Sequence, residues 1–254
     1  MFDFLKRATI QIKQSKGNKQ SIYLNIGCDV YPDGMIKNLP QTSTQKKAHV
    51  LLEKEDFDGA IELYRNSSEM SWDYYTDING SFIWKAQYKS LYGEFPKPDY
   101  LISVYFSYGN AYFLRGKCTE KSDKESVLDD LIKARKAYEI ALALARNNDI
   151  LCSYSLYHIA TVDTVVMCFD SLENFTEHYA NVIRVISDTI TYINEASDIA
   201  RDKVIVDELR TKIITLLKEI EKFSNSPNFK RIYRDKKKRT ELLQSLFCLR
   251  ERVS

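Results

Sequence analysis

The sequence predicts a mainly α-helical protein, an array of helices preceded by a small N-terminal β-hairpin. Its 254 residues include only 8 glycines and 5 prolines, less than half of the roughly 12% that average usage implies. All of the glycines lie at or before Gly116, and Pro227 is the only proline beyond that position. Strand-rich folds need frequent turns made with these residues, whereas long helices exclude them. The second half of the chain is therefore expected to be helical almost throughout.

The first 45 residues carry the strand pattern. Residues 9–13 and 21–26 alternate apolar and polar side chains, which is the period of a half-buried strand. The segment 14–20 between them has the composition of a turn, so we predict a β-hairpin. Because a lone two-stranded hairpin is marginally stable in water, it is expected to dock on the helices or to pair with a partner.

Apolar residues spaced by three and four positions predict two long helices in the second half of the chain. The face of the first consists of Phe175, Tyr179, Val182, Ile183, Ile186, Ile190 and Ile193, and that of the second of Ile205, Leu209, Ile213, Leu216, Leu217, Ile220 and Phe223. Residues 229–249 are predicted to form a last helix, which swings away from the body at Pro227. The predicted units are a hairpin and linker (1–45), a helical array (46–225) and a basic C-terminal helix (226–254).

Two segments repeat one helix–turn–helix pattern of small and large residues. The first, within residues 48–70, carries Ala48, Leu51, Asp56, Phe57, Ala60, Tyr64 and Ser67, and the second carries Tyr105, Tyr108, Gly109, Tyr112, Gly116, Ala134, Tyr138 and Ala141. Both segments resemble the tetratricopeptide repeat. The resemblance implies antiparallel helix pairs that stack into a superhelix with a groove, because one repeat cannot bury its own apolar face. It also implies a protein–protein interaction scaffold or adaptor that binds a peptide or helix of a partner.

The small residues of the second segment have a physical role. Gly109, Ala134 and Ala141 let two antiparallel helices approach closely, and large residues such as Tyr138 fill the spaces between their turns. The segment departs from the repeat by an insertion at 117–130, which is expected to be an extra loop or helix.

The resemblance places a partner in a groove lined by the signature helix, and we predict Tyr105, Asn110 and Arg115 as partner-binding residues. Asn110 offers both a donor and an acceptor to a peptide backbone, and Arg115 offers a guanidinium to a carboxylate. Trp72 and Trp84 belong to a dense aromatic cluster that is predicted to anchor the partner further. The other interpretation of these aromatic residues is that they fill space between helices.

A basic segment near the C-terminus supports an alternative function, a nucleic-acid-associated regulatory protein. The candidate contacts are Lys230, Arg231, Tyr233, Arg234, Lys236, Lys237, Lys238 and Arg239. Their cations can bind phosphates, and Tyr233 can stack on a base. Residues 226–254 hold nine Lys and Arg against three Asp and Glu, but residues 48–225 hold 20 against 29, so the bulk of the chain does not attract a polyanion. The basic run is otherwise a solvated face or a helix that caps the array.

No pattern of residues points to catalysis, a metal or a cofactor, and we expect a non-enzymatic protein. The histidines His49, His158 and His178 have metal-ligating neighbours only in pairs, such as His49 with Glu53, which is fewer than a zinc site requires. Cys168 with a histidine is a formal nucleophile pair, but its apolar surroundings predict an inert thiol. An enzyme with an unfamiliar site is the third class of function.

The cysteines and the N-terminus predict a reducing compartment and no membrane insertion. The five cysteines are an odd number, are widely spaced and lack a Cys-x-x-Cys pair, so we expect buried free thiols instead of disulfides. The first residues carry no apolar run long enough for a signal peptide, and no segment approaches the ~20 apolar residues of a membrane span. We therefore expect a soluble, cytoplasmic protein, with homo-oligomerisation left open.

Overall fold

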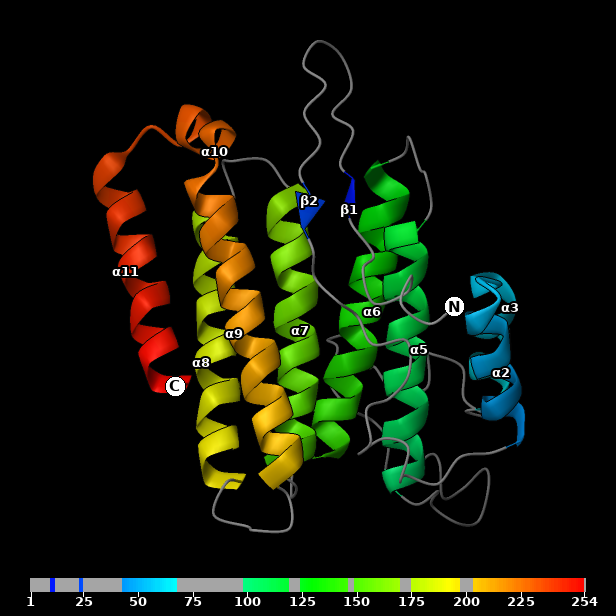
Figure 1. The fold of residues 1–254 in the computed structure, drawn as a ribbon. Helices are drawn as coiled ribbons and strands as arrows, with labels where there is room; N and C mark the ends of the chain where they lie inside the picture. The colour runs from blue at the N-terminus through cyan, green and yellow to red at the C-terminus, as the bar shows by residue number, and fades with distance from the viewer. Residues whose placement is uncertain are drawn as a thin grey trace, which may run out of the picture.

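The structure, a computed structural model, is mainly helical, which confirms the predicted fold class at this level (Figure 1). It describes residues 10–11, 23–24, 43–67, 98–118, 124–145, 149–169, 175–196 and 203–253. The helices are α2 (Ser43–Glu53), α3 (Phe57–Ser67), α5 (Pro98–Cys118), α6 (Lys124–Leu144), α7 (Asp149–Phe169), α8 (Phe175–Ala196), α9 (Lys203–Asn225), α10 (Pro227–Ile232) and α11 (Lys236–Val253).

Two short strands lie in the N-terminal region, β1 (Ile10–Gln11) and β2 (Tyr23–Leu24). They pair antiparallel, with Ile10 opposite Leu24 and Gln11 opposite Tyr23. The residues between them and the rest of the predicted hairpin lie outside the described part of the chain. The hairpin as a whole therefore stays a prediction.

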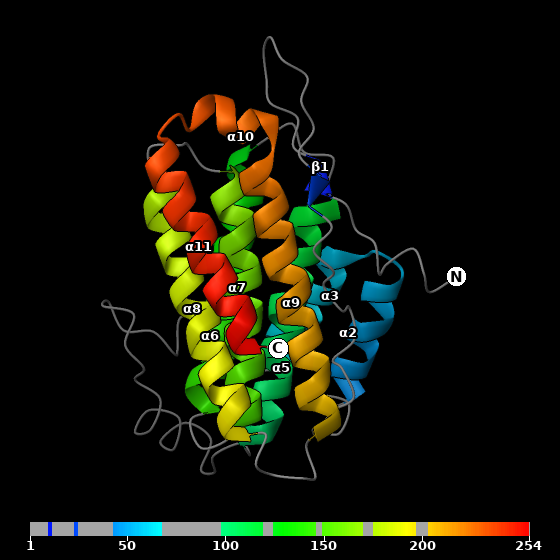
Figure 2. The same cartoon turned by 60° about the vertical axis from the view of Figure 1, so that its left-hand side comes forward.

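The long helices α5 to α9 lie side by side and run alternately in opposite directions (Figures 1 and 2). α5 packs against α6, α6 against α7 and α7 against α8, while α9 packs on α7 and α8. The short pair of α2 and α3 packs on α5 at one side of the array, and α11 packs on α8 and α9 at the other. The two helices predicted from apolar spacing at 175–193 and 205–223 are confirmed as α8 and α9.

The predicted close approach of two helices at Gly109 is confirmed. A Cβ atom at this position of α5 would lie 2.6 Å from Cε1 of Tyr138, which is fully buried on α6. The hydroxyl of Tyr138 donates a hydrogen bond to Oδ1 of Asn110 (2.6 Å), the residue after the glycine. Part of the insertion predicted at 117–130 is helical, because α6 begins at Lys124.

The C-terminal segment differs from its prediction in two respects. The single helix predicted over 229–249 is divided into α10 and α11, since Asp235 caps the second helix by accepting a hydrogen bond from the Lys238 N–H (3.0 Å). The helix also does not swing away at Pro227, because α11 packs against α8 and α9. Leu246, Leu249 and Val253 are the buried residues of α11, and this apolar stripe holds it on the array.

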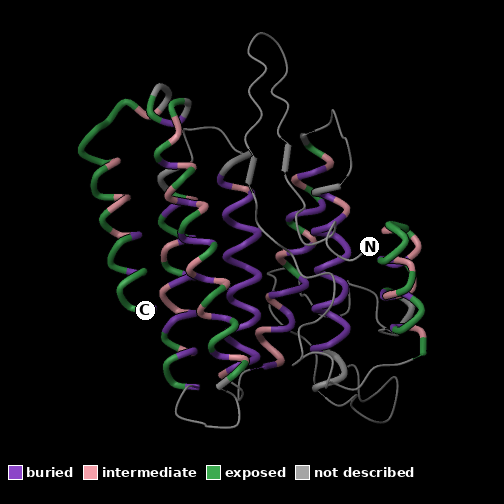
Figure 3. The backbone as a smooth tube through the Cα atoms, in the orientation of Figure 1, coloured by how far each residue is buried: buried purple, intermediate pink, exposed green. Residues whose placement is uncertain are grey.

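α7 lies among the other long helices and is buried along nearly its whole length (Figure 3). Its segment Asp149–Met167 has a mean hydropathy of 1.3 and is, by length and composition, apolar enough to cross a membrane. The prediction that no segment approaches a membrane span is therefore wrong, although 89% of this window is buried inside the protein. Buried hydroxyls such as that of Thr164 donate to the carbonyl one turn earlier, here Ala160 (2.7 Å).

The turn between α2 and α3 holds Glu55 at a φ of 61°, in the left-handed region that favours glycine. Glu55→Gly is expected to raise the free energy of unfolding by about 0.5–1 kcal/mol, because it removes the clash of Cβ with the backbone. Urea unfolding measures the change. Lys54→Gly is the matched control and is expected to lower stability; an equal effect of both substitutions would contradict the assignment of strain to Glu55.

Candidate functional site

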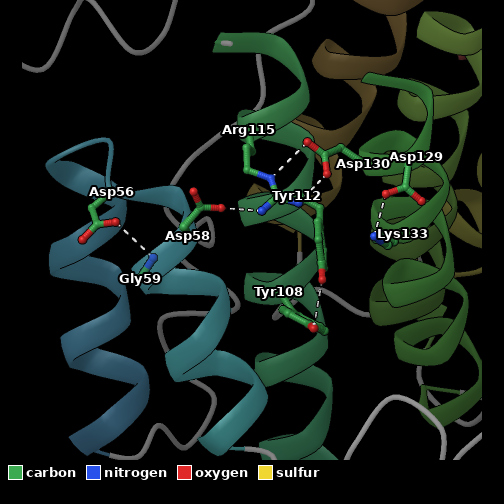
Figure 4. A network of polar contacts seen from close by, with 9 residues as sticks. All are labelled: Asp56, Asp58, Gly59, Tyr108, Tyr112, Arg115, Asp129, Asp130 and Lys133. Atoms are coloured by element: carbon green, nitrogen blue, oxygen red, sulfur yellow. Dashed lines mark hydrogen bonds and ion pairs between the residues drawn. The ribbon is translucent and has the colours of Figure 1, made fainter. Parts of the chain in front are cut away.

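Arg115, a predicted partner-binding residue, lies at the centre of a polar network that joins three helices (Figure 4). Its Nε and Nη2 donate to the two carboxylate oxygens of Asp130 on α6, at 3.0 and 2.5 Å. Its Nη1 donates to Asp58 on α3, at 2.5 Å. The Arg115 side chain is 23% exposed, against 84% for Asp58 and 2% for Asp130. The hydrogen bonds with Asp130 are the largest cause of the raised pKa of Arg115.

The other two predicted residues on α5 are in the core. Tyr105 and Asn110 are each 2% exposed, and Oδ1 of Asn110 is the acceptor for the Tyr138 hydroxyl. The structure thus does not bring Tyr105, Asn110 and Arg115 together on one open face. Trp72 and Trp84 lie outside the described residues.

The sequence holds a signal for the burial of α5. Large apolar residues occur on all sides of this helix, through Ile102, Val104, Phe106, Phe113 and Leu114, all of which are buried. A helix that is apolar all round is packed on all sides. A helix packed on all sides cannot line an open groove. The apolar pattern of α5 is therefore stronger evidence about its position than the repeat signature is.

His49 joins α2 to α5. Its Nε2 lies 3.1 Å from Oγ of Ser107, and Nε2 of Gln45, one turn earlier, donates to Oγ of Ser103 (2.7 Å). Burial lowers the pKa of His49 from its ordinary value of 6.5 to about 4, because the low-dielectric interior disfavours the imidazolium.

The lowered pKa of His49 predicts a loss of stability in mild acid. Below pH 6.5 the unfolded chain binds a proton at this residue, whereas the folded chain binds it only near pH 4. The free energy of unfolding is therefore expected to fall as the pH falls through this window, with a contribution of about 2 kcal/mol from His49 at pH 5. Urea unfolding at pH 7.5 and pH 5 measures it. His49→Gln is expected to lose less stability; an equal loss in both proteins would refute the assignment.

A groove runs between α8 and α11, with a volume of about 850 Å³. Tyr179 and Ile183 of α8 and Leu242 and Leu249 of α11 are its main apolar lining residues, and Tyr233 lines it between α10 and α11. The two helices run in the same direction (Figures 1 and 2). The groove was not predicted from the sequence, because its two walls are separated by some sixty positions and neither has a motif.

Two hydrogen bonds fix the spacing of the groove walls. The hydroxyl of Tyr179 donates to the carbonyl of Leu242 (2.5 Å). Further along both helices, Nη1 of Arg252 donates to Oγ of Ser187 (2.8 Å). Burial raises the pKa of Tyr179, so this hydroxyl stays protonated as a donor. Contacts in two places thus join the two parallel helices that form the groove walls.

The predicted nucleic-acid contacts cluster near the Tyr233 end of this groove. Lys230, Arg234, Lys236, Lys237 and Lys238 are exposed, and none of them forms an ion pair with another described residue. Lys238 also lines the groove. No side chain is described for Arg231.

The other two predicted contacts have partners within the protein. Arg239 is partly buried, and its Nη1 donates to the carbonyl of Lys230 (3.0 Å). Tyr233 stacks on Phe229, with ring centroids 5.3 Å apart and planes 20° apart. One face of the Tyr233 ring is therefore occupied.

A second hollow, of about 610 Å³, lies on the other side of α8. It is lined by residues of α6, α7 and α8 and shares Arg184 and Asp188 with the groove. These two residues form an ion pair at 3.7 Å between exposed side chains. The lining of this hollow is more polar, with Glu139 and Glu195 among its residues.

The described residues hold no group of three His, Cys, Asp or Glu side chains close enough to bind a metal ion. His158 is buried among aromatic rings, with Tyr138 stacked on it at 4.8 Å. Cys152 is a buried free thiol, as predicted, but Cys248 on α11 is an exposed one, so the expectation that all cysteines are buried is wrong. The reason is that Cys248 lies beside the buried stripe of α11 and not within it.

No family model, no curated protein and no solved structure matches the chain. The resemblance to the tetratricopeptide repeat therefore stays a prediction that rests on the two motifs.

Proposed function

We propose that the chain is a non-enzymatic protein–protein interaction scaffold or adaptor, built as a tetratricopeptide-like array, which binds a helix or peptide of a partner. The observation that carries the proposal is the groove between α8 and α11, about 850 Å³ in volume. Its size and apolar lining suit the helix-in-groove mode of recognition, in which an amphipathic helix lays its apolar face between two others.

The arrangement of the helices supports the array. α2 with α3 and α5 with α6 are sequential packed pairs, as are α7 with α8. The contact of Gly109 with Tyr138 occurs at the position where the repeat signature places a small residue against a large one. The proposal places the partner on α8 and α11 and not on α5, because Tyr105 and Asn110 are buried.

The lining of the groove supports a peptide or helix as the ligand. Ile183 and Leu242 are partly buried and supply apolar contacts, and the partly buried ring of Tyr233 offers rigid aromatic surface. Tyr179 and Leu249 are buried and form the base of the groove. Exposed apolar surface of this kind marks binding sites on proteins.

A substitution that fills the groove tests the proposal. Ala180 lines the groove and is exposed, so Ala180→Trp is expected to leave the fold intact and to obstruct the groove. The matched control is Asn181→Trp, at the next exposed position of α8 and outside the groove. Partners captured from native-host lysate by the full chain are expected to be lost with Ala180→Trp and retained with Asn181→Trp. Identical capture by the two variants, both folded by circular dichroism, would refute the groove as the binding site.

A further inference from the structure

We infer that the partner segment is an acidic amphipathic helix, whose apolar face fills the α8–α11 groove and whose carboxylates meet the lysines at the first turn of α11. This inference rests on the proposed function and names the chemistry of its partner. Three arguments support it: the lysines lie at one end of the groove, they are placed unfavourably at the N-terminus of α11, and apolar residues line the groove beyond them.

The lysines lie where a groove-bound helix would meet them. Lys236, Lys237 and Lys238 are exposed and form no ion pair with the described residues. Lys238 lines the groove together with Tyr233, which places the cations beside one end of it. Long flexible ammonium groups at this end can reach the carboxylates of a helix that lies in the groove.

The same lysines occupy the end of α11 that is unfavourable for positive charge. The first turn of this helix contains no acidic residue, and the unpaired N–H groups of a helix N-terminus carry partial positive charge. Lys236, Lys237, Lys238 and Arg239 therefore repel both the helix end and one another. Asp235 supplies the one carboxylate directly before them, as the cap. An anionic partner would remove this repulsion. Binding would therefore explain why the helix begins with residues that are unfavourable for its stability.

The apolar surface beside the lysines favours an acidic helix over a nucleic acid. Leu242 lines the groove one turn beyond Lys238, and Ile183 lines it on α8. A phosphodiester backbone offers no apolar face to cover them. Tyr233 has one ring face packed on Phe229, which reduces what it offers for base stacking. Arg184 and Asp188 line the groove on α8. Glu241 lines it three positions after Lys238, so the three lysines outnumber the one carboxylate that lines this end. We therefore expect the acidic residues to be concentrated at one end of the partner helix.

The test uses a displayed library of 18-residue helical peptides with Leu and Ala fixed on one face and Asp, Glu, Lys or Ser varied elsewhere. Selection on the full chain is expected to enrich Asp and Glu at one end of the peptide. A selected peptide is expected to bind Lys237→Glu/Lys238→Glu at least tenfold more weakly. The matched control, Lys46→Glu/Lys47→Glu, reverses two exposed lysines on α2 and is expected to change binding less than twofold.

Thermal unfolding separates a lost contact from a damaged fold. The Tm of Lys237→Glu/Lys238→Glu without peptide is expected to be equal to or above that of the unaltered chain, because acidic residues suit the first turn of a helix. A selected peptide that binds this variant as well as it binds the unaltered chain would overturn the inference.

The remaining outcomes distinguish this inference from the proposed function. Peptides without acidic enrichment whose binding is lost with Ala180→Trp would overturn the acidic partner and leave the groove as a binding site. Peptides unaffected by Ala180→Trp, or no selected peptide, would overturn both. A 20-base-pair DNA duplex is the counter-probe; salt-sensitive binding of DNA that is lost with Lys237→Glu/Lys238→Glu but kept with Ala180→Trp would replace the acidic helix with nucleic acid.

Discussion

Replacing Arg115 with alanine is expected to lower the free energy of unfolding by about 3 kcal/mol. The variant removes the guanidinium that donates to both oxygens of the Asp130 carboxylate, whose side chain is 2% exposed. A buried charge that loses its counter-charge destabilises a fold strongly, because water cannot reach it to replace the lost interaction. Urea unfolding at pH 7 measures the difference.

Two further variants assign this loss to the buried end of the network. Asp58→Ala removes the other ion pair of Arg115 and is expected to cost less than about 1 kcal/mol, because the Asp58 side chain is 84% exposed. Arg115→Ala combined with Asp130→Asn is expected to be more stable than Arg115→Ala alone, since the amide carries no charge. Equal losses from Arg115→Ala and Asp58→Ala would show that burial of the carboxylate does not set the cost.

Gly109→Ala is expected to lower the free energy of unfolding by about 2 kcal/mol, although alanine favours helices by about 1 kcal/mol over glycine. The added Cβ would lie 2.6 Å from Cε1 and 2.9 Å from Cδ1 and Cζ of Tyr138. A ring that is fully buried can move away only by separating α5 from α6. Thermal or urea unfolding reports the net loss.

The partner of Gly109 can be tested by changing Tyr138. Tyr138→Leu shortens the side chain, so Gly109→Ala is expected to cost at least 1 kcal/mol less in this background. Tyr138→Phe is the control: it removes the hydrogen bond to Asn110 but keeps the ring, and the cost of Gly109→Ala is expected to persist. A similar cost in the leucine and phenylalanine backgrounds would contradict the ring clash.

The features that were predicted correctly are those that depend on residues close together in the sequence. The apolar spacing over 175–193 and 205–223 was sufficient for α8 and α9, since each buries one stripe and exposes the rest. The small residue at Gly109 predicted the close contact of α5 and α6, because only a missing side chain permits it. Each of these predictions concerns a single helix or two consecutive helices, so it did not depend on how distant parts of the chain pack.

The candidate site could not be predicted in the same way. The groove depends on α11 returning along α8, and that return follows from the break at Asp235 and the short buried stripe of Leu246, Leu249 and Val253. The residues predicted on α5 do not form one open face, because this helix is buried on all sides. The repeat motif does not encode that burial, although the apolar residues all round the helix indicate it. Tyr105 is an example, at 2% exposure.

Site-specific photo-crosslinking in the native host tests whether the face between α8 and α11 binds a partner. A photoreactive residue replaces Gln244, which is exposed and lines the groove, or Phe247, which is 61% exposed on the same helix and lies outside the groove. We predict a discrete crosslinked protein from position 244 that is absent from position 247 and is lost when Ala180→Trp fills the groove. Crosslinks that are the same from both positions, or that persist with the groove filled, would show that the groove does not bind a partner.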